Sequence, residues 1–315
     1  MTIAFVFPGQ GSQSVGMLDA FAGDQTVQSV LREADAALGE PLSRLIAEGP
    51  AETLALTVNT QPAVLVGSYA CYAAWRAAGG PEPAAVAGHS LGEYTAMTVA
   101  GILTLAEAVP LVRQRAQAMQ EAVPVGVGGM AVVMGLDDEA VRNACREAEA
   151  QVPGEVVEAV NFNAPSQVVI AGNKAAVDRA CERAKAAGAK RALALAVSAP
   201  FHSSLLRPAG ERLGEVLARM TLRAPRIALV NNVDVAVETE PARIADALVR
   251  QAYSPVRWVE VVAKLRALGV DRVVEFGAGK VLAGLVGRID REMKVSAVYD
   301  PATLEAALKD LGGGA

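Results

Sequence analysis

The stretch "AAVAGHSLGEY", residues 84–94, combines a short apolar run, a serine between two glycines and the start of a helical pattern. Residues 84–87 are of the types found in a buried strand, and helix-forming residues follow from Leu91. A strand, turn and helix carrying G-x-S-x-G is typical of a nucleophile elbow, whose strained turn exposes the serine hydroxyl. Gly88 and Gly92 would let the strand and the helix pass closely. The stretch therefore predicts an α/β fold with Ser90 as the candidate nucleophile.

The same residues would also suit a glycine-rich turn in which Ser90 only caps the helix. A serine hydroxyl becomes an effective nucleophile only when a neighbouring base takes its proton. The chain has two histidines, and His89 adjoins Ser90 in the elbow, where the two side chains should diverge. By elimination, His202 in "SAPFHSS" is the candidate base. No motif supplies an acidic third member, so we expect a Ser–His dyad oriented by a backbone carbonyl or an amide.

Strand-like apolar runs alternate with helical patterns along most of the chain. The runs "IAFVF", "AAVAG", "IALVNN" and "RVVEFG" each precede helical segments, which predicts a mainly parallel sheet covered by helices on both faces. In the middle, the order becomes strand, helix, strand, strand, helix, strand, which is ferredoxin-like. We therefore predict a small inserted subdomain at residues 127–197, with residues 1–126 and 198–315 forming the larger one. One helix is expected to begin near Pro62, after the polar stretch "TVNTQP".

Composition argues against several classes of protein. The 315 residues are 52% hydrophobic, which is enough to bury a large core. A net charge of -5 without a dense basic run, and an aromatic content of 4%, argue against nucleic-acid binding. The apolar residues 53–75 are interrupted by "TVNTQP", so no membrane association is expected. Three scattered cysteines and two histidines match no metal-binding pattern, and they predict a reducing, cytoplasmic location without a metal.

Two further segments carry candidate polar groups. The first strand ends in "FPGQGSQ", residues 7–13, which begins like a dinucleotide-binding loop but lacks its third glycine and its acidic residue. Alternatively, Gln10 lies beside the elbow and supports an oxyanion donor next to the Leu91 amide, and the residues alone leave both interpretations open. Arg113 and Arg115 lie two residues apart on a predicted helix. One of them can therefore point inward and suit a substrate carboxylate, while the other stays in water.

Eight motifs, in order along the chain, closely resemble those of the malonyl-CoA:acyl carrier protein transacylase family. They are "FPGQGSQ", "GHSLGEY", "LVRQRAQAMQEAVP", "VNFNAPSQVVIAG", "SAPFHS", "NNVD", "ALVRQ" and "VEFGAGKVL". The resemblance implies an α/β-hydrolase-like parallel-sheet subdomain with a ferredoxin-like insertion, in agreement with the strand order. It also implies malonyl transfer from malonyl-CoA to the phosphopantetheine thiol of acyl carrier protein for fatty acid biosynthesis. The implied reaction is ping-pong, passes through a malonyl-serine intermediate and needs no cofactor of the enzyme's own.

The resemblance also implies a role for seven residues. Ser90 would be the acylated nucleophile, His202 the base, Gln10 and Leu91 the oxyanion hole, Arg115 the site for the malonyl carboxylate, Gln251 the support of His202, and Phe201 the limit on acyl size. A serine thioesterase or esterase would share the elbow but would gain nothing from a buried Arg115. A stand-alone acyltransferase of a polyketide synthase would share all of the chemistry. A non-catalytic carrier-binding module would not need Ser90 at all.

Overall fold

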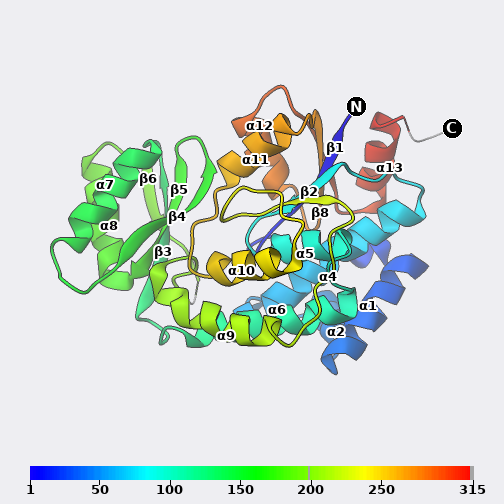
Figure 1. Ribbon diagram of the computed structural model, residues 1–315, viewed down its shortest axis with the longest axis horizontal. Helices are drawn as coiled ribbons and strands as arrows, with labels where there is room; N and C mark the ends of the chain where they lie inside the picture. Colours follow the sequence, from blue (N-terminus) through cyan, green and yellow to red (C-terminus); the bar gives the residue numbers. More distant parts are fainter. Residues whose placement is uncertain (198, 313–315) are drawn as a thin grey trace.

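Two sheets organise the chain, and Figure 1 shows them as a larger and a smaller lobe. The structure is a computed structural model that describes residues 1–197 and 199–312. The sheet of the larger lobe is parallel, in the order β7 (Ala228–Val230), β2 (Ala85–Gly88), β1 (Ile3–Phe7), β8 (Arg272–Phe276), β9 (Lys294–Val298). The sheet of the smaller lobe is antiparallel, in the order β4 (Val157–Ala164), β5 (Gln167–Asn173), β3 (Gly128–Met134), β6 (Arg191–Ala194).

Helices connect the parallel strands, as parallel pairing requires. Those of the larger lobe are α1 (Gln25–Leu38), α2 (Leu42–Glu48), α3 (Ala51–Leu54), α4 (Thr57–Ala77), α5 (Gly92–Val99), α6 (Leu105–Glu121), α9 (Arg207–Leu217), α10 (Pro241–Gln251), α11 (Trp258–Ala267), α12 (Val281–Ile289) and α13 (Pro301–Asp310). The smaller lobe contains α7 (Asp138–Glu149) and α8 (Lys174–Ala186). Short 3-10 helices lie at Asp19–Phe21 and Ser204–Leu206.

The central strands of the parallel sheet are buried on both faces. Successive side chains of a strand point to opposite faces, so β1 contributes to two cores. Phe5 and Phe7 pack in one core with residues of α4, α5 and α6. Ala4 and Val6 pack on the other face with residues of α11 and α12. The predicted parallel sheet with helices on both faces is confirmed.

The smaller lobe has the ferredoxin-like order predicted from the sequence. Helices α7 and α8 share a core with one face of its sheet, and the other face packs against Met119 of α6 and against Phe201. The segment that carries the candidate base therefore lies between the two lobes. The elements of the smaller lobe lie between Gly128 and Ala194, while the exact boundaries at residues 127 and 197 stay a prediction. Ser198 and residues 313–315, assigned by that prediction to the larger subdomain, lie outside the described residues.

Helix α4 begins earlier than the sequence predicted. We expected it to start near Pro62, but it runs from Thr57 and includes that proline. The hydroxyl of Thr60 donates a hydrogen bond of 2.6 Å to the carbonyl oxygen of Leu54 in α3. This contact ties the first turn of α4 to the preceding helix, and the helix continues through Pro62 at its sixth position, although a proline there removes a backbone donor and crowds the preceding turn. The polar stretch that we interpreted as a break is therefore helical.

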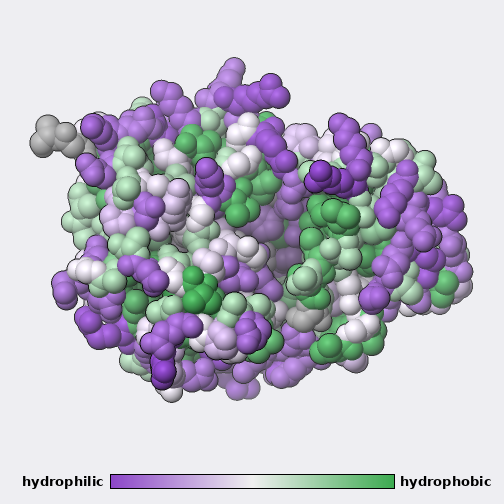
Figure 2. Space-filling model, turned by 180° about the vertical axis from the view of Figure 1, so that it is seen from behind, coloured by the Kyte–Doolittle hydropathy of each residue, from purple (hydrophilic) through white to green (hydrophobic). Residues whose placement is uncertain are grey.

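Figure 2 shows the side of the molecule that faces away in Figure 1. Hydrophilic groups cover most of the outer surface, while hydrophobic groups gather around a hollow between the two lobes. A concave surface with apolar walls is a common place for a small ligand to bind. Within the two described ranges, no helix combines the length and the apolar character that crossing a bilayer requires.

Candidate active site

Ser90 lies in the tight turn between β2 and α5. Its backbone φ is +52°, in the left-handed region that residues other than glycine seldom adopt. A Cβ on Gly88 would lie 1.8 Å from the carbonyl carbon of Gly92, and a Cβ on Gly92 would lie 1.9 Å from the carbonyl oxygen of Phe7. The prediction that both glycines permit close passage of strand and helix is confirmed.

We expect Gly92→Ala to destabilise the protein by about 2 to 3 kcal/mol, because the added methyl group meets backbone atoms that cannot rotate away. Gly287 in α12 is a matched control, since nothing lies within 4 Å of the position its Cβ would take. Gly287→Ala should leave stability unchanged or raise it by up to about 1 kcal/mol. Chemical denaturation of both variants measures the difference, and equal unfolding free energies would contradict this account.

The structure brings Ser90 and His202 together from positions 112 residues apart. The distance from Ser90 Oγ to His202 Nε2 is 2.7 Å, and that from His202 Nδ1 to the backbone carbonyl oxygen of Gln251 is 2.9 Å. A carbonyl oxygen only accepts hydrogen bonds, so Nδ1 carries the hydrogen and Nε2 is left to accept the serine proton. The arrangement is that of a nucleophile and base in which a backbone carbonyl takes the place of an acidic third residue.

We expect acylation of Ser90 to proceed at a constant rate between about pH 5 and pH 6.5, where a histidine of ordinary pKa would pass from almost fully protonated to half protonated. Burial, followed by the charge of Arg115, lowers the pKa of His202 to about 3. A histidine acts as a base only above its pKa, in its neutral form, so His202 remains competent throughout this range. Rapid-quench measurements of acylation would test this expectation. A fall in rate with a midpoint at the ordinary histidine pKa would contradict it.

Arg115 points inward from α6, whereas Arg113 on the same helix is only partly buried. Arg115 is 2% exposed. Its Nη1 donates to Gln61 Oε1 at 2.7 Å, and its Nη2 donates to Gln251 Oε1 at 3.0 Å and to Ser90 Oγ at 3.2 Å. Burial lowers the pKa of the guanidinium from its ordinary value. A cation therefore lies beside the serine oxygen, within reach of a carboxylate close to the reacting carbon.

Gln251, the last residue of α10, is fully buried and contacts the other polar groups of the site. Its backbone carbonyl oxygen accepts from His202, and its side-chain oxygen accepts from Arg115. Its side-chain nitrogen donates to the carbonyl oxygen of Ser90 at 3.0 Å. One residue thus touches the nucleophile turn, the candidate base and the buried cation.

Gln10, Leu91 and Phe201 lie in the wall of the pocket around the nucleophile. Leu91 directly precedes α5, so its amide is at the amino end of that helix. The loop after β1 approaches the elbow so closely that a Cβ on Gly9 would lie 2.7 Å from the carbonyl oxygen of His89. The other lining residues are Gln61, His89, Ser90, Arg115, Met119, Met130, Asn161, Leu195, Val197 and His202. The loop therefore adjoins the nucleophile, which favours the oxyanion interpretation over a dinucleotide loop.

Three buried polar residues to which the sequence analysis gave no role also belong to the site: Gln61, Glu93 and Asn232. Asn232 Oδ1 accepts from the amide of Ser90 at 2.7 Å, and its Nδ2 donates to the carbonyl oxygen of Gly88 at 2.7 Å. The amide of Asn232 donates to Glu93 Oε2 at 3.0 Å. Glu93 lies in the motif "GHSLGEY" and Asn232 in "NNVD". Their membership in these motifs was the signal in the sequence that could have marked them as residues of the site.

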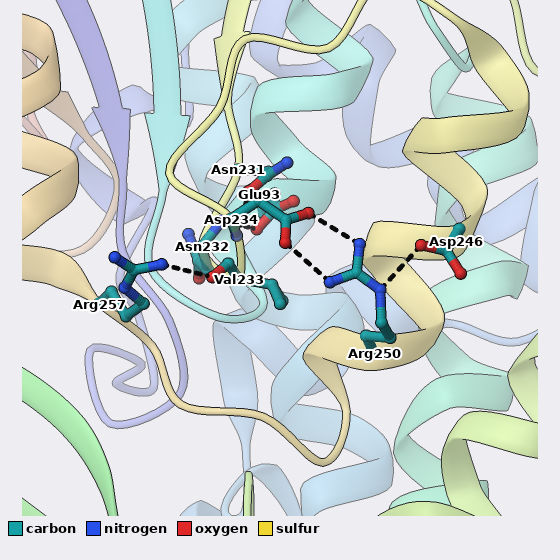
Figure 3. Close-up of polar contacts among 8 residues, drawn as sticks. All are labelled: Glu93, Asn231, Asn232, Val233, Asp234, Asp246, Arg250 and Arg257. Carbon is teal, nitrogen blue, oxygen red and sulfur yellow. Dashed lines mark hydrogen bonds and ion pairs between the residues drawn. The ribbon is translucent and has the colours of Figure 1, made fainter.

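Arg250 connects the loop that carries Asn232 to the helix that carries Gln251. Figure 3 shows its guanidinium between Asp234 in that loop and Asp246 in α10. Nη1 and Nη2 donate to the two oxygens of Asp234 at 2.9 and 2.7 Å, and Nε donates to Asp246 Oδ2 at 2.7 Å. A bidentate arginine–carboxylate pair restricts the relative geometry of its two partners. The pair therefore helps to fix Gln251, the next residue along the chain.

Known proteins resemble the chain over nearly its full length. The family described as "Acyl transferase domain" matches residues 4–298. The chain is 53% identical to a malonyl CoA-acyl carrier protein transacylase of Salmonella typhimurium, over 97% of this chain and 98% of that protein. The solved acyl-carrier-protein S-malonyltransferase of Burkholderia pseudomallei 1710b is 61% identical, with a TM-score of 0.96 over 98% of this chain and 100% of that one. A malonyl-transacylase solved in complex with its type II PKS acyl-carrier protein is 47% identical, with a TM-score of 0.96 and the same coverage.

Proposed function

Because the chain belongs to the malonyl CoA-acyl carrier protein transacylase family, we propose that it moves a malonyl group from malonyl-CoA to the phosphopantetheine thiol of acyl carrier protein through an ester on Ser90. The buried guanidinium of Arg115, 3.2 Å from Ser90 Oγ, is the observation that carries this proposal. A cation at that place serves a substrate with a free carboxylate near the reacting carbonyl. A thioesterase or esterase for uncharged acyl groups would gain nothing from it.

Transfer begins when Ser90 Oγ attacks the thioester carbonyl carbon. His202 Nε2 takes the hydroxyl proton, while the bond from its Nδ1 to Gln251 keeps the ring in the required tautomer. The developing oxyanion lies at the Leu91 amide and the loop that contains Gln10. The carbon–sulfur bond then breaks, the proton passes from His202 to the CoA sulfur, and malonyl-Ser90 remains.

The second half of the cycle repeats these steps with another thiol. The phosphopantetheine thiol of the carrier protein gives its proton to His202 and attacks the ester carbonyl, and Ser90 recovers its hydroxyl hydrogen. Ser90 supplies the nucleophile and His202 the base, and the steps involve no change of oxidation state, so the proposed cycle calls on no redox cofactor and uses only the phosphopantetheine of the partner. Phe201, 8% exposed in the pocket wall, limits branching at the α-carbon. One methyl group is worth about 1 to 3 kcal/mol in such a pocket, which favours malonyl over methylmalonyl.

We assign the carrier protein to fatty acid biosynthesis and the reaction to the cytoplasm. Cys71, Cys145 and Cys181 are buried and unpaired, which fits a reducing compartment. A polyketide acyltransferase would use the same steps with another carrier protein. Comparing the rates at which carrier proteins of the two pathways accept the malonyl group separates these alternatives.

Intact-protein mass spectrometry after brief mixing with malonyl-CoA tests the proposed function. We expect an adduct with the mass of a malonyl group, which the thiol form of acyl carrier protein then removes. Steady release of free malonate without an adduct would instead indicate a thioesterase. Absence of both an adduct and turnover would contradict catalysis at the elbow.

A further inference from the structure

Glu93 is a buried carboxyl group that the proposed transfer steps do not use. It is 2% exposed and lies in α5, beside the loop that carries Asn232 (Figure 3). Its Oε2 accepts from Gln251 Nε2 at 2.8 Å and from the amide of Asn232 at 3.0 Å. Removing a carboxyl group from water is costly unless hydrogen bonds replace the lost hydration. The contacts that compensate this cost lead directly to the residues around Ser90.

The partners of the Gln251 side chain require its amide to point in one direction. Nε2 faces two acceptors, Glu93 Oε2 and the carbonyl oxygen of Ser90, while Oε1 faces the guanidinium of Arg115. Turning the amide over would place its NH2 group against the guanidinium and its oxygen against two acceptors. Glu93 supplies the side-chain acceptor, at 2.8 Å from Gln251 Nε2, compared with 3.0 Å for the backbone carbonyl oxygen of Ser90. The direction of the Gln251 amide therefore depends on Glu93.

We propose that Glu93 is a positioning residue that fixes the amide of Gln251 and, through it, the guanidinium of Arg115 in the direction that receives the malonyl carboxylate. This inference rests on the proposed function, in which Arg115 binds the substrate. The same carboxyl oxygen holds Asn232, whose side chain bonds the backbone of the elbow at Gly88 and Ser90. Glu93 thus connects the nucleophile turn to the cation that selects the acyl group.

The surroundings of Glu93 fit a role for its acceptor atom rather than for its charge. Burial raises the pKa of Glu93 to about 7, opposed by the bonds from Gln251 and Asn232 and by the charge of Arg115, while the charge of Asp234 raises it further. The strands packed against α5, β1 and β2, carry no titratable side chain. A carboxyl protonated on Oε1 still accepts hydrogen bonds at Oε2, so Gln251 is held in both protonation states.

Two substitutions at Glu93 separate the acceptor from the charge. Glu93→Gln keeps an oxygen at the same reach and removes the charge, whereas Glu93→Asp keeps the charge and withdraws the oxygen by roughly 1.5 Å. The readout is the ratio of kcat/KM for malonyl-CoA to kcat/KM for acetyl-CoA, because a smaller fraction of folded enzyme lowers both values equally. We expect Glu93→Asp to lower this ratio about tenfold and Glu93→Gln to keep it within about twofold of the native value.

Glu275 provides matched control substitutions. It is fully buried, burial raises its pKa to about 7, and its carboxylate accepts from the amides of Leu282 and Ala283 at the start of α12. Glu275→Asp and Glu275→Gln should leave the ratio unchanged. The inference is overturned if Glu93→Gln lowers the ratio as far as Glu93→Asp does, or if Glu93→Asp leaves it unchanged. Arg115→Ala distinguishes failure of the Glu93 inference from failure of the proposed function. If that variant kept the native ratio of kcat/KM for malonyl-CoA to kcat/KM for acetyl-CoA, Arg115 would not bind the malonyl carboxylate, and the proposed function would be contradicted.

Discussion

Replacing Ser90 with alanine should abolish the malonyl adduct and lower kcat by about 10⁴-fold or more, because the variant has no oxygen to carry the acyl group. The backbone of the elbow should remain in place, since the bonds from Asn232 reach main-chain atoms of Ser90 and Gly88. The measurement is intact-protein mass spectrometry after mixing with malonyl-CoA, together with the rate of malonyl transfer to acyl carrier protein.

Ser68→Ala is the matched control for this substitution. Ser68 is fully buried in α4, and its hydroxyl has no hydrogen-bond partner among the residues that the structure describes. The control variant should form the adduct at the native rate. If the Ser90→Ala variant still gained the mass of a malonyl group, the nucleophile would lie elsewhere in the chain. The proposed Ser90–His202 dyad would then lose its basis.

Arg115→Ala should lower kcat/KM for malonyl-CoA on the order of 100-fold, which corresponds to about 3 kcal/mol for a lost hydrogen-bonded charge pair in a buried site. The value for acetyl-CoA should change much less, because acetyl has no carboxylate for the guanidinium to bind. Steady-state kinetics with both substrates measure the two effects. Thermal unfolding shows how far the loss of contacts to Gln61 and Gln251 weakens the fold.

Arg113→Ala controls for the removal of an arginine from α6. Arg113 pairs with Glu40 at 3.0 Å, and the Glu40 side chain is 57% exposed. Arg113 is not among the described residues that line the pocket around Ser90, so the variant should keep the native preference for malonyl-CoA. Equal losses with malonyl-CoA and acetyl-CoA in the Arg115 variant would show that this arginine supports the fold and does not select the acyl group.

Local patterns in the sequence were sufficient for the elbow and for most of the sheet. A Cβ on Gly88 or Gly92 would overlap backbone atoms, because the strand and the helix pass so closely at this turn. The spacing of these two glycines around Ser90 therefore predicted the turn. His202 followed by elimination, since the chain has only two histidines. Strand β9 was missed, because its residues are mostly only partly buried at the edge of the sheet and form no continuous apolar run.

The sequence by itself determined the order of most strands and helices, the turn at Ser90 and the residue types available for chemistry. These features depend on residue spacing and backbone conformation within short segments. Helical spacing separated Arg113 from Arg115 without saying which one faces the core. The family resemblance assigned the substrate role to Arg115, and the tertiary structure showed its burial and its contacts. Only the tertiary structure decided that Glu93 meets Gln251, 158 residues away. The physical reason is that such contacts arise from the packing of α10 and the β7–α10 loop against α5, which no local pattern encodes.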